Sequence, residues 1–141
     1  MNKRVVHREA EPAPNYAVAV LIVTPQGIPL IRDPKKPHPV FWKAPGGRSA
    51  PGESAAAAIV REVKEELGII LRDKELAVVH EENRGSHILV LFSAHLKSLP
   101  KLKSIGDEGE EIKLFSAQQI LAMPDFFPNH RAAFEKTLRA S

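Results

Sequence analysis

Residues 47–69 read GRSAPGESAAAAIVREVKEELGI, and this stretch decides how the rest of the chain is interpreted. A run of alanines is followed by aliphatic residues that recur every fourth position up to Leu67, which predicts a helix with one apolar face. Gly68 stands where a glycine in the left-handed conformation would end that helix. We therefore expect a helix over residues 53–67, entered through a glycine-rich loop.

This helix would carry Glu62, Glu65 and Glu66 on neighbouring positions, toward the end where the helix dipole disfavours negative charge. One interpretation is a solvated acidic face, and the helix alone favours it. The other is a site for Mg²⁺ or Mn²⁺, which bind hard carboxylate oxygens. The glycines of the preceding loop favour the second interpretation, because they let the backbone approach a ligand closely.

The same stretch resembles the signature of the Nudix hydrolases, which reads G, five residues, E, seven residues, then R-E-U-x-E-E-x-G-U, where U is aliphatic. Every fixed position matches, namely Gly47, Glu53, Arg61, Glu62, Val63, Glu65, Glu66, Gly68 and Ile69. From average residue frequencies, a chance match in such a chain is on the order of one in ten million. The resemblance implies an α+β fold, an α/β/α sandwich with a mixed sheet.

The resemblance also implies an activity, the hydrolysis of a pyrophosphate bond in a nucleoside diphosphate linked to another moiety. A nucleoside triphosphate or a similar small nucleotide is the expected substrate, and Mg²⁺ is the expected cofactor, with Mn²⁺ as the alternative. The implied metal ligands are Glu62, Glu65, Glu66 and the carbonyl of Gly46. The implied catalytic group consists of Glu53, Arg61, Glu65 and Glu108, with Arg61 holding Glu53 and orienting the carboxylates.

A glutamate from a later loop often supplies a metal ligand or the base in this family. Glu108 is chosen over Glu110 and Glu111 for this role because residues 108–116 resemble the corresponding loop of the mutator-type pyrophosphohydrolases, in which the first glutamate supplies it. At least two of these three glutamates are expected to be exposed. Candidate substrate contacts are Arg32, Lys43, Gly47, Arg48 and Asn129.

Residues 126–129 resemble the place where mutator-type members read an oxidised guanine with an asparagine, but the spacing of Asn129 does not match cleanly, and a helix N-cap is the commoner role of such an asparagine. Trp42 could stack on a base or anchor the loop that follows it. The sequence lacks the proline typical of ADP-ribose hydrolases and the tyrosine typical of diadenosine polyphosphate hydrolases. The six histidines show no metal-ligand spacing, and only His87 is a candidate for lining the cleft.

Outside the signature, β-branched and alternating runs predict strands over residues 16–23, 28–32, 76–82, 88–96 and 112–115. Residues 41–44 are expected to be extended, and helices are expected over residues 117–122 and 129–140. Prolines predict an irregular N-terminal arm over residues 1–15. The expected organisation is therefore this arm and a single Nudix domain over residues 16–141.

The chain has 141 residues, a size typical of one domain, with 43% hydrophobic and 26% charged residues. Its net charge of +3 favours anionic partners, but the basic residues are scattered, and no strong nucleic-acid signal is present. It has no cysteine, no secretory signal and no apolar run long enough to span a membrane. We expect a cytoplasmic monomer or homodimer. The alternatives are an RNA 5′-end pyrophosphohydrolase and a nucleotide sensor without hydrolytic activity.

Overall fold

The computed structural model describes residues 14–141, so most of the expected N-terminal arm lies outside the described residues. The elements are β1 (Tyr16–Val23), β2 (Ile28–Arg32), β3 (Gly46–Arg48), α2 (Ala55–Leu67), the 3-10 helix η1 (Asp73–Glu75), β4 (Leu76–Asn83), β5 (Ile88–His95), β6 (Glu111–Phe115), α3 (Ala117–Ala122) and α4 (Pro128–Arg139). A mixed sheet in the order β3-β1-β5-β4 forms the centre of the molecule, and β2 pairs with β6 in a separate ribbon.

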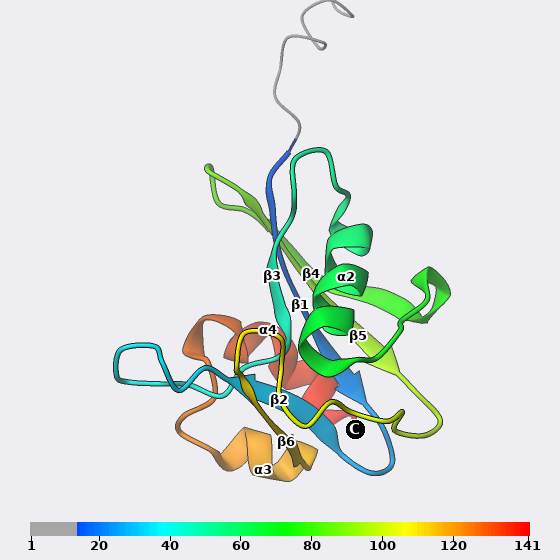
Figure 1. Cartoon of the computed structure of the whole chain (residues 1–141), viewed down its shortest axis with the longest axis vertical. Coiled ribbons are helices and arrows are strands. Elements are labelled where there is room, and N and C mark those ends of the chain that lie inside the picture. Colours follow the sequence, from blue (N-terminus) through cyan, green and yellow to red (C-terminus); the bar gives the residue numbers. More distant parts are fainter. Residues whose placement is uncertain (1–13) are drawn as a thin grey trace, which may run out of the picture.

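Helices cover both faces of the central sheet, with α2 in front and α4 behind (Figure 1). The alternation of β1 explains this arrangement, because successive side chains of a strand point to opposite faces. Val18, Val20 and Ile22 pack in the cluster that contains the apolar face of α2. Ala19 and Leu21 pack in the other cluster, which contains the apolar residues of α3 and α4. The expected α+β sandwich with a mixed sheet is therefore confirmed.

The helix of the signature begins two residues later than expected. Ser54 is its N-cap, and its hydroxyl accepts a hydrogen bond from the Ala57 backbone N–H at 3.1 Å. Glu53 therefore belongs to the loop and not to the helix. The predicted end is confirmed, because Gly68 has a φ of 77° and its N–H donates to the Lys64 carbonyl.

The last helix, α4, begins at Pro128, one residue before the predicted start. Proline is favoured in the first turn because its missing N–H would have no partner inside the helix. Phe127 occupies the N-cap position, so Asn129 lies inside the first turn and is not the cap. The cap interpretation of Asn129 was therefore wrong.

Trp42 anchors the loop before β3. Its side chain is 7% exposed and packs edge-on against Phe115, with ring centroids 5.2 Å apart. This position supports the anchor interpretation over base stacking. Within the part of the chain that the structure describes, no helix has the length and apolarity needed to cross a bilayer.

Candidate active site

Arg61 joins the glycine-rich loop to α2. Its guanidinium donates from Nε and from Nη2 to the two carboxylate oxygens of Glu53, each at 2.9 Å. Glu53 also accepts from the Ala50 N–H at 2.8 Å. These hydrogen bonds, that of Arg61 first, lower the pKa of Glu53 to about 2. The loop thus folds back over the helix and is held there by a fully ionised pair.

The same guanidinium reaches three further acceptors. Its Nη2 donates to the Arg48 carbonyl at 3.0 Å, which ties β3 to the helix. Its Nη1 lies 3.3 Å from Glu62 and 3.4 Å from Glu65. Arg61 therefore links the strand, the loop and two of the carboxylates of α2.

Glu66 is the buried carboxylate of this group, with only 8% of its surface exposed. Its one recorded hydrogen bond comes from the Gly46 N–H at 2.9 Å. Burial, followed by repulsion from Glu62, raises the pKa of Glu66 to about 8. Gly46 therefore contacts Glu66 through its N–H in this structure, whereas the sequence prediction concerned its carbonyl oxygen.

The two glycines of β3 lie directly against neighbouring atoms. A Cβ on Gly46 would be 2.0 Å from the Val18 carbonyl oxygen of the adjacent strand. A Cβ on Gly47 would be 2.4 Å from a carboxylate oxygen of Glu62. The strand thus runs directly against the acidic side chains of α2.

A second acidic segment, residues 106–111, closes this side of the site. Glu110 is 7% exposed, and its carboxylate accepts from the Glu108 N–H at 3.0 Å. Besides burial, the negative charge of Glu108 contributes to the raised pKa of Glu62, and that of Glu110 contributes to the raised pKa of Glu66. Glu111 pairs instead with Arg32 at 3.0 Å. Glu108 is exposed, Glu110 is buried and Glu111 is intermediate, so the expectation that at least two of the three are exposed was wrong for the buried Glu110 and holds only in part for Glu111.

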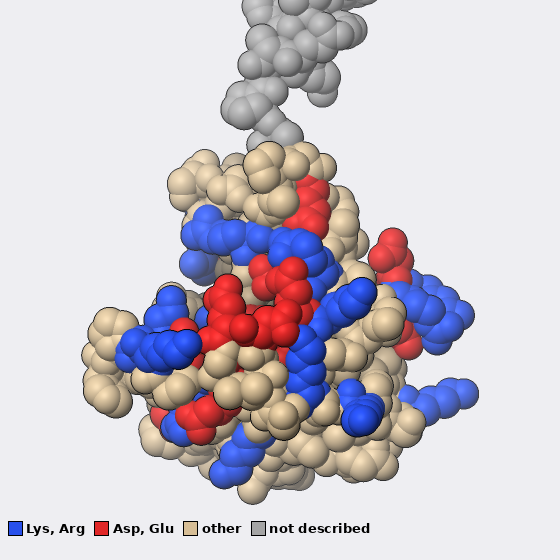
Figure 2. All heavy atoms as spheres, in the orientation of Figure 1, with Lys and Arg blue, Asp and Glu red and all other residues tan. Residues whose placement is uncertain are grey.

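These side chains form an acidic patch bordered by basic residues (Figure 2). Carboxylate oxygens are the ligands that Mg²⁺ and Mn²⁺ prefer, so the chemistry of the donors fits a divalent cation. Burial first, with repulsion from neighbouring carboxylates, raises the pKa values of Glu62 and Glu66, and a bound cation would favour their charged forms. Within residues 14–141 no three acidic or histidine side chains already surround one point. Two of the carboxylates, Glu62 and Glu65, instead pair with Arg61.

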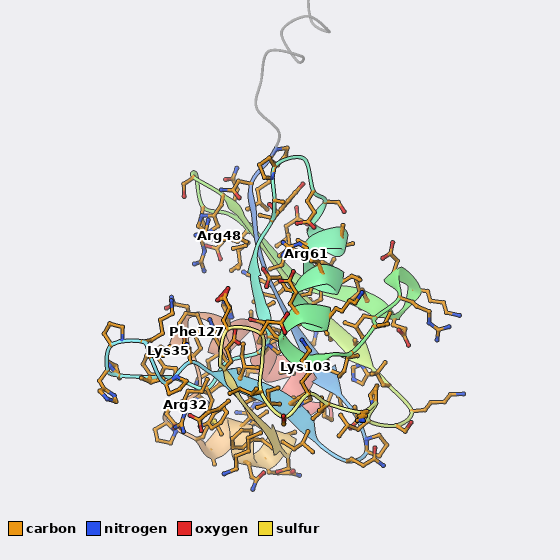
Figure 3. All side chains as sticks on the ribbon, viewed as in Figure 1. Arg32, Lys35, Arg48, Arg61, Lys103 and Phe127 are labelled. Atoms are coloured by element: carbon orange, nitrogen blue, oxygen red, sulfur yellow. The ribbon has the colours of Figure 1, made fainter. Side chains whose placement is uncertain are left out.

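A cavity of about 170 Å³ opens on the other side of β3. It is lined by Ala17, Val18, Ala19, Lys43, Ala44, Gly46, Gly47, Arg48, Leu89, Phe127 and His130. Since Gly47 contacts this cavity and also lies against Glu62, the cavity and the acidic patch share one wall. In Figure 3, Arg61 lies at α2, while Arg48 and Phe127 lie on the other side of β3. Arg48 and Phe127 both line the cavity.

Comparison with known proteins identifies this architecture. The model of the NUDIX domain matches residues 13–137, which is most of the chain. The chain belongs to the Nudix family. The family resemblance inferred from the signature is therefore confirmed.

This Nudix chain is similar to longer proteins. It is 32% identical over 111 residues to an ADP-ribose pyrophosphatase of Methanocaldococcus jannaschii, covering 76% of this chain and 64% of that protein. It is 32% identical over 114 residues to a nudix hydrolase of Caenorhabditis elegans, covering 75% of this chain and 31% of the other. It thus spans less than two thirds of either relative.

A solved structure from a study of MutT from Aliivibrio salmonicida and Vibrio cholerae has a similar fold. It superimposes with a TM-score of 0.71 at 23% identity, covering 91% of this Nudix chain and 98% of that one. At this identity the likeness shows the fold alone.

The structure separates the candidate substrate contacts of this Nudix domain into two groups. Lys43, Gly47 and Arg48 line the cavity beside the acidic patch. Arg32 instead donates to Glu111 and stacks over Trp42, with its guanidinium carbon 4.4 Å from the ring centroid. Asn129 is exposed and does not line the cavity.

His130 lines the cavity, and His87, the histidine that the sequence suggested, does not. The sequence analysis missed His130 because no spacing pattern marks it. The signal available was its place directly after the Phe-Phe-Pro-Asn segment. Burial, with the positive charges of Arg84 and Lys43 and the neighbouring His80, lowers the pKa of His130 to about 4. The ring is therefore neutral at pH 7.

Because His130 takes up its proton more readily in the unfolded chain, acid should destabilise this Nudix domain. The stability that depends on a neutral His130 ring is fully present above pH 6.5, and the free energy of unfolding falls as the pH drops toward 4. The drop of about 2.5 pKa units corresponds to about 3 kcal/mol. Urea unfolding should therefore show that the free energy of unfolding falls more between pH 7 and pH 4 for the wild type than for His130→Gln. Equal losses in the two proteins would contradict this prediction.

Proposed function

We propose that this chain hydrolyses a pyrophosphate bond in a nucleoside diphosphate linked to another moiety, with a divalent cation held at the acidic patch. The observation that carries the proposal is the wall shared by the acidic patch and the cavity, in which Gly47 lies against Glu62. A nucleotide whose base sits in the cavity would reach the carboxylates of α2 only with phosphates that extend past β3.

Glu62, Glu65 and Glu66 would hold the cation, which supplies charge neutralisation at the phosphates and activation of water when bound. Glu66 lies closest to the core, whereas the side chain of Glu65 is 46% exposed. The carbonyl of Gly46 is the candidate fourth ligand. Mg²⁺ and Mn²⁺ both suit oxygen donors of this kind.

Arg61 and Glu53 would act as positioning residues. Their paired hydrogen bonds fix the loop against α2, and the remaining guanidinium nitrogen, Nη1, is shared by Glu62 and Glu65. Such outer contacts orient the ligands of a metal site. Lys43 and Arg48, on the cavity side of β3, would contact the phosphates.

The reaction would begin when a water oxygen forms a bond to one phosphorus. The bond from that phosphorus to the bridging oxygen breaks, and the bridging oxygen leaves with the other phosphoryl group. Glu65 is the favoured acceptor of the water proton, because it is accessible and its only side-chain partner is Arg61 at 3.4 Å. Glu108, exposed on the facing loop, is the second candidate.

The test is the release of phosphate and pyrophosphate from a nucleotide panel, with Mg²⁺ or Mn²⁺ and with EDTA. The panel contains ribonucleoside and deoxyribonucleoside triphosphates, oxidised dGTP, ADP-ribose, diadenosine polyphosphates and RNA with a 5′-triphosphate. We expect turnover of one class, lost in EDTA and restored by added cation. Nucleotide binding without turnover of any member would overturn the proposal in favour of a sensor.

A further inference from the structure

Two adjoining cavities lie at the end of β5, on the face of the central sheet that packs against α4. One, of about 630 Å³, lies between the turn of η1 and the segment that follows β5. The other, of about 410 Å³, is lined on the helix side by Ala133, Lys136 and Thr137 of α4. Ser93 and His95 line both cavities, so the two form one hollow, which we call the β5 groove.

The alternation of β5 explains why the floor of this groove is polar. Leu89 and Leu91 point toward α4 and are buried in its core cluster. Ser93 and His95 occupy the next two positions on the same face. Ala77, which pairs with Ser93 across the sheet, also lines the groove. Ser93 is 5% exposed, so a buried hydroxyl group, which can both donate and accept hydrogen bonds, lies in the floor.

The rim of the β5 groove is cationic. Arg72, Lys74 and Lys97 line the larger cavity, and Lys136 lines the smaller one. Glu75 is the only carboxylate among the described residues that line either cavity. It is already paired, because one of its oxygens lies 3.5 Å from the Arg72 guanidinium and the other accepts from the Arg72 N–H at 2.9 Å. The groove therefore carries an excess of positive charge.

We propose that the β5 groove binds a small ligand with two or more phosphate groups, at a site separate from the proposed catalytic site. Phosphate oxygens accept charge-assisted hydrogen bonds from ammonium and guanidinium groups. Because cations line both cavities, a chain of phosphates contacts more of them than a single phosphate does.

A nucleic-acid strand fits the groove less well. Proteins that bind single strands offer aromatic side chains on which the bases stack. None of the described residues that line the groove is Phe, Tyr or Trp. Each cavity also has the volume of a small-molecule pocket, about 300–1,000 Å³.

The β5 groove is distinct from the cavity beside β3. Among the described residues, the two have no lining residue in common. Leu89 lines the cavity beside β3, and Ser93 lies four residues further along the same strand, about 13 Å away. Binding in the groove therefore does not depend on the proposed hydrolysis, and each can be refuted without the other.

The first test is calorimetric titration of the chain with tripolyphosphate, pyrophosphate and orthophosphate in EDTA. The chelator removes the divalent cations through which the acidic patch would bind phosphate. We expect tripolyphosphate to bind most tightly and orthophosphate least tightly. Tripolyphosphate should shift the backbone amide resonances of Ser93, His95 and Lys97, whereas that of Gly47 should not move. No binding of any of the three, or shifts confined to the cavity beside β3, would overturn the proposal.

Variants distinguish a built site from general attraction to a basic chain. Lys74→Gln/Lys97→Gln should weaken tripolyphosphate binding about 10-fold or more, because two charged contacts are lost. The matched control, Lys64→Gln/Lys113→Gln, removes the same charge from exposed positions outside the groove. Ser93→Ala should weaken binding about 3- to 10-fold without any change of net charge. Equal losses in the two double variants would overturn the proposal.

A single-stranded RNA with a 5′-hydroxyl separates the two sources of phosphate. We expect it to bind more weakly than tripolyphosphate. Tighter binding of the RNA, with the same amide shifts, would overturn the proposal in favour of a nucleic-acid interface. Turnover by Lys74→Gln/Lys97→Gln without added oligophosphate should equal that of the wild type. A chain that binds tripolyphosphate in the groove but hydrolyses no nucleotide would refute the proposed function and leave this inference standing.

Discussion

Replacing Glu66 with glutamine should reduce kcat/KM by about 1,000-fold or more while leaving the chain folded. Glu66 is the most buried carboxylate of α2, and its oxygen accepts from the Gly46 N–H. A glutamine amide oxygen can accept the same hydrogen bond, so the packing of β3 on α2 is retained. The negative charge proposed to hold the cation is lost.

The measurement pairs turnover in saturating Mg²⁺ with urea unfolding in EDTA. Because burial and Glu62 raise the pKa of Glu66, removing its charge should not lower the stability of the metal-free protein at pH 9. Glu135→Gln serves as the control, since Glu135 forms a surface pair with Arg139 on α4. Turnover of Glu66→Gln within a few-fold of the wild type would contradict the assignment of Glu66.

Replacing Gly46 with alanine should destabilise the fold by about 3 kcal/mol. The added Cβ would lie 2.0 Å from the Val18 oxygen and 2.7 Å from the Ala19 Cα, and both are backbone atoms of the adjacent strand. No side-chain rotation relieves this overlap, so β3 would have to move away from β1. A marked fall in the urea midpoint is expected.

Gly47→Ala provides the contrast within the same strand. Its Cβ would meet the carboxylate of Glu62, which is the end of a flexible side chain and can move away. We therefore expect a smaller loss of stability than for Gly46→Ala, but a clear loss of turnover because Glu62 is displaced. Equal urea midpoints for the two variants would contradict this account of the strand.

The helix of the site and its acidic face could be predicted from local pattern. The spacing of the aliphatic residues up to Leu67 and the position of Gly68 depend only on the periodicity of a helix and on backbone sterics. The compact β-branched run over residues 16–23 likewise predicted a strand. The start of α4 was predicted one residue late, because the local signals of Pro128 and Asn129 compete.

The candidate substrate contacts could not be predicted so well. Arg32 and Lys43 are both basic residues that the sequence offers equally as phosphate contacts. In the structure Arg32 pairs with Glu111 of a distant strand, whereas Lys43 lines the cavity. Glu108, Glu110 and Glu111 are adjacent or nearly so, yet they differ in exposure because the loop of Glu110 folds inward. Partners of this kind lie far apart along the chain, so no local pattern encodes them.

The sequence by itself determined the family and the helix that carries the carboxylates, because these follow from spacing within a single segment. The pairing of Arg61 with Glu53 was implied by the family resemblance, and it depends on the loop folding back over the helix. The tertiary structure alone decided that Gly46 and Gly47 press against β1 and Glu62, and that His130 faces the cavity with a buried, unpaired nitrogen. Those features arise where β1, β3, α2 and α4 meet. Burial and desolvation are properties of such contacts and not of any one stretch of chain.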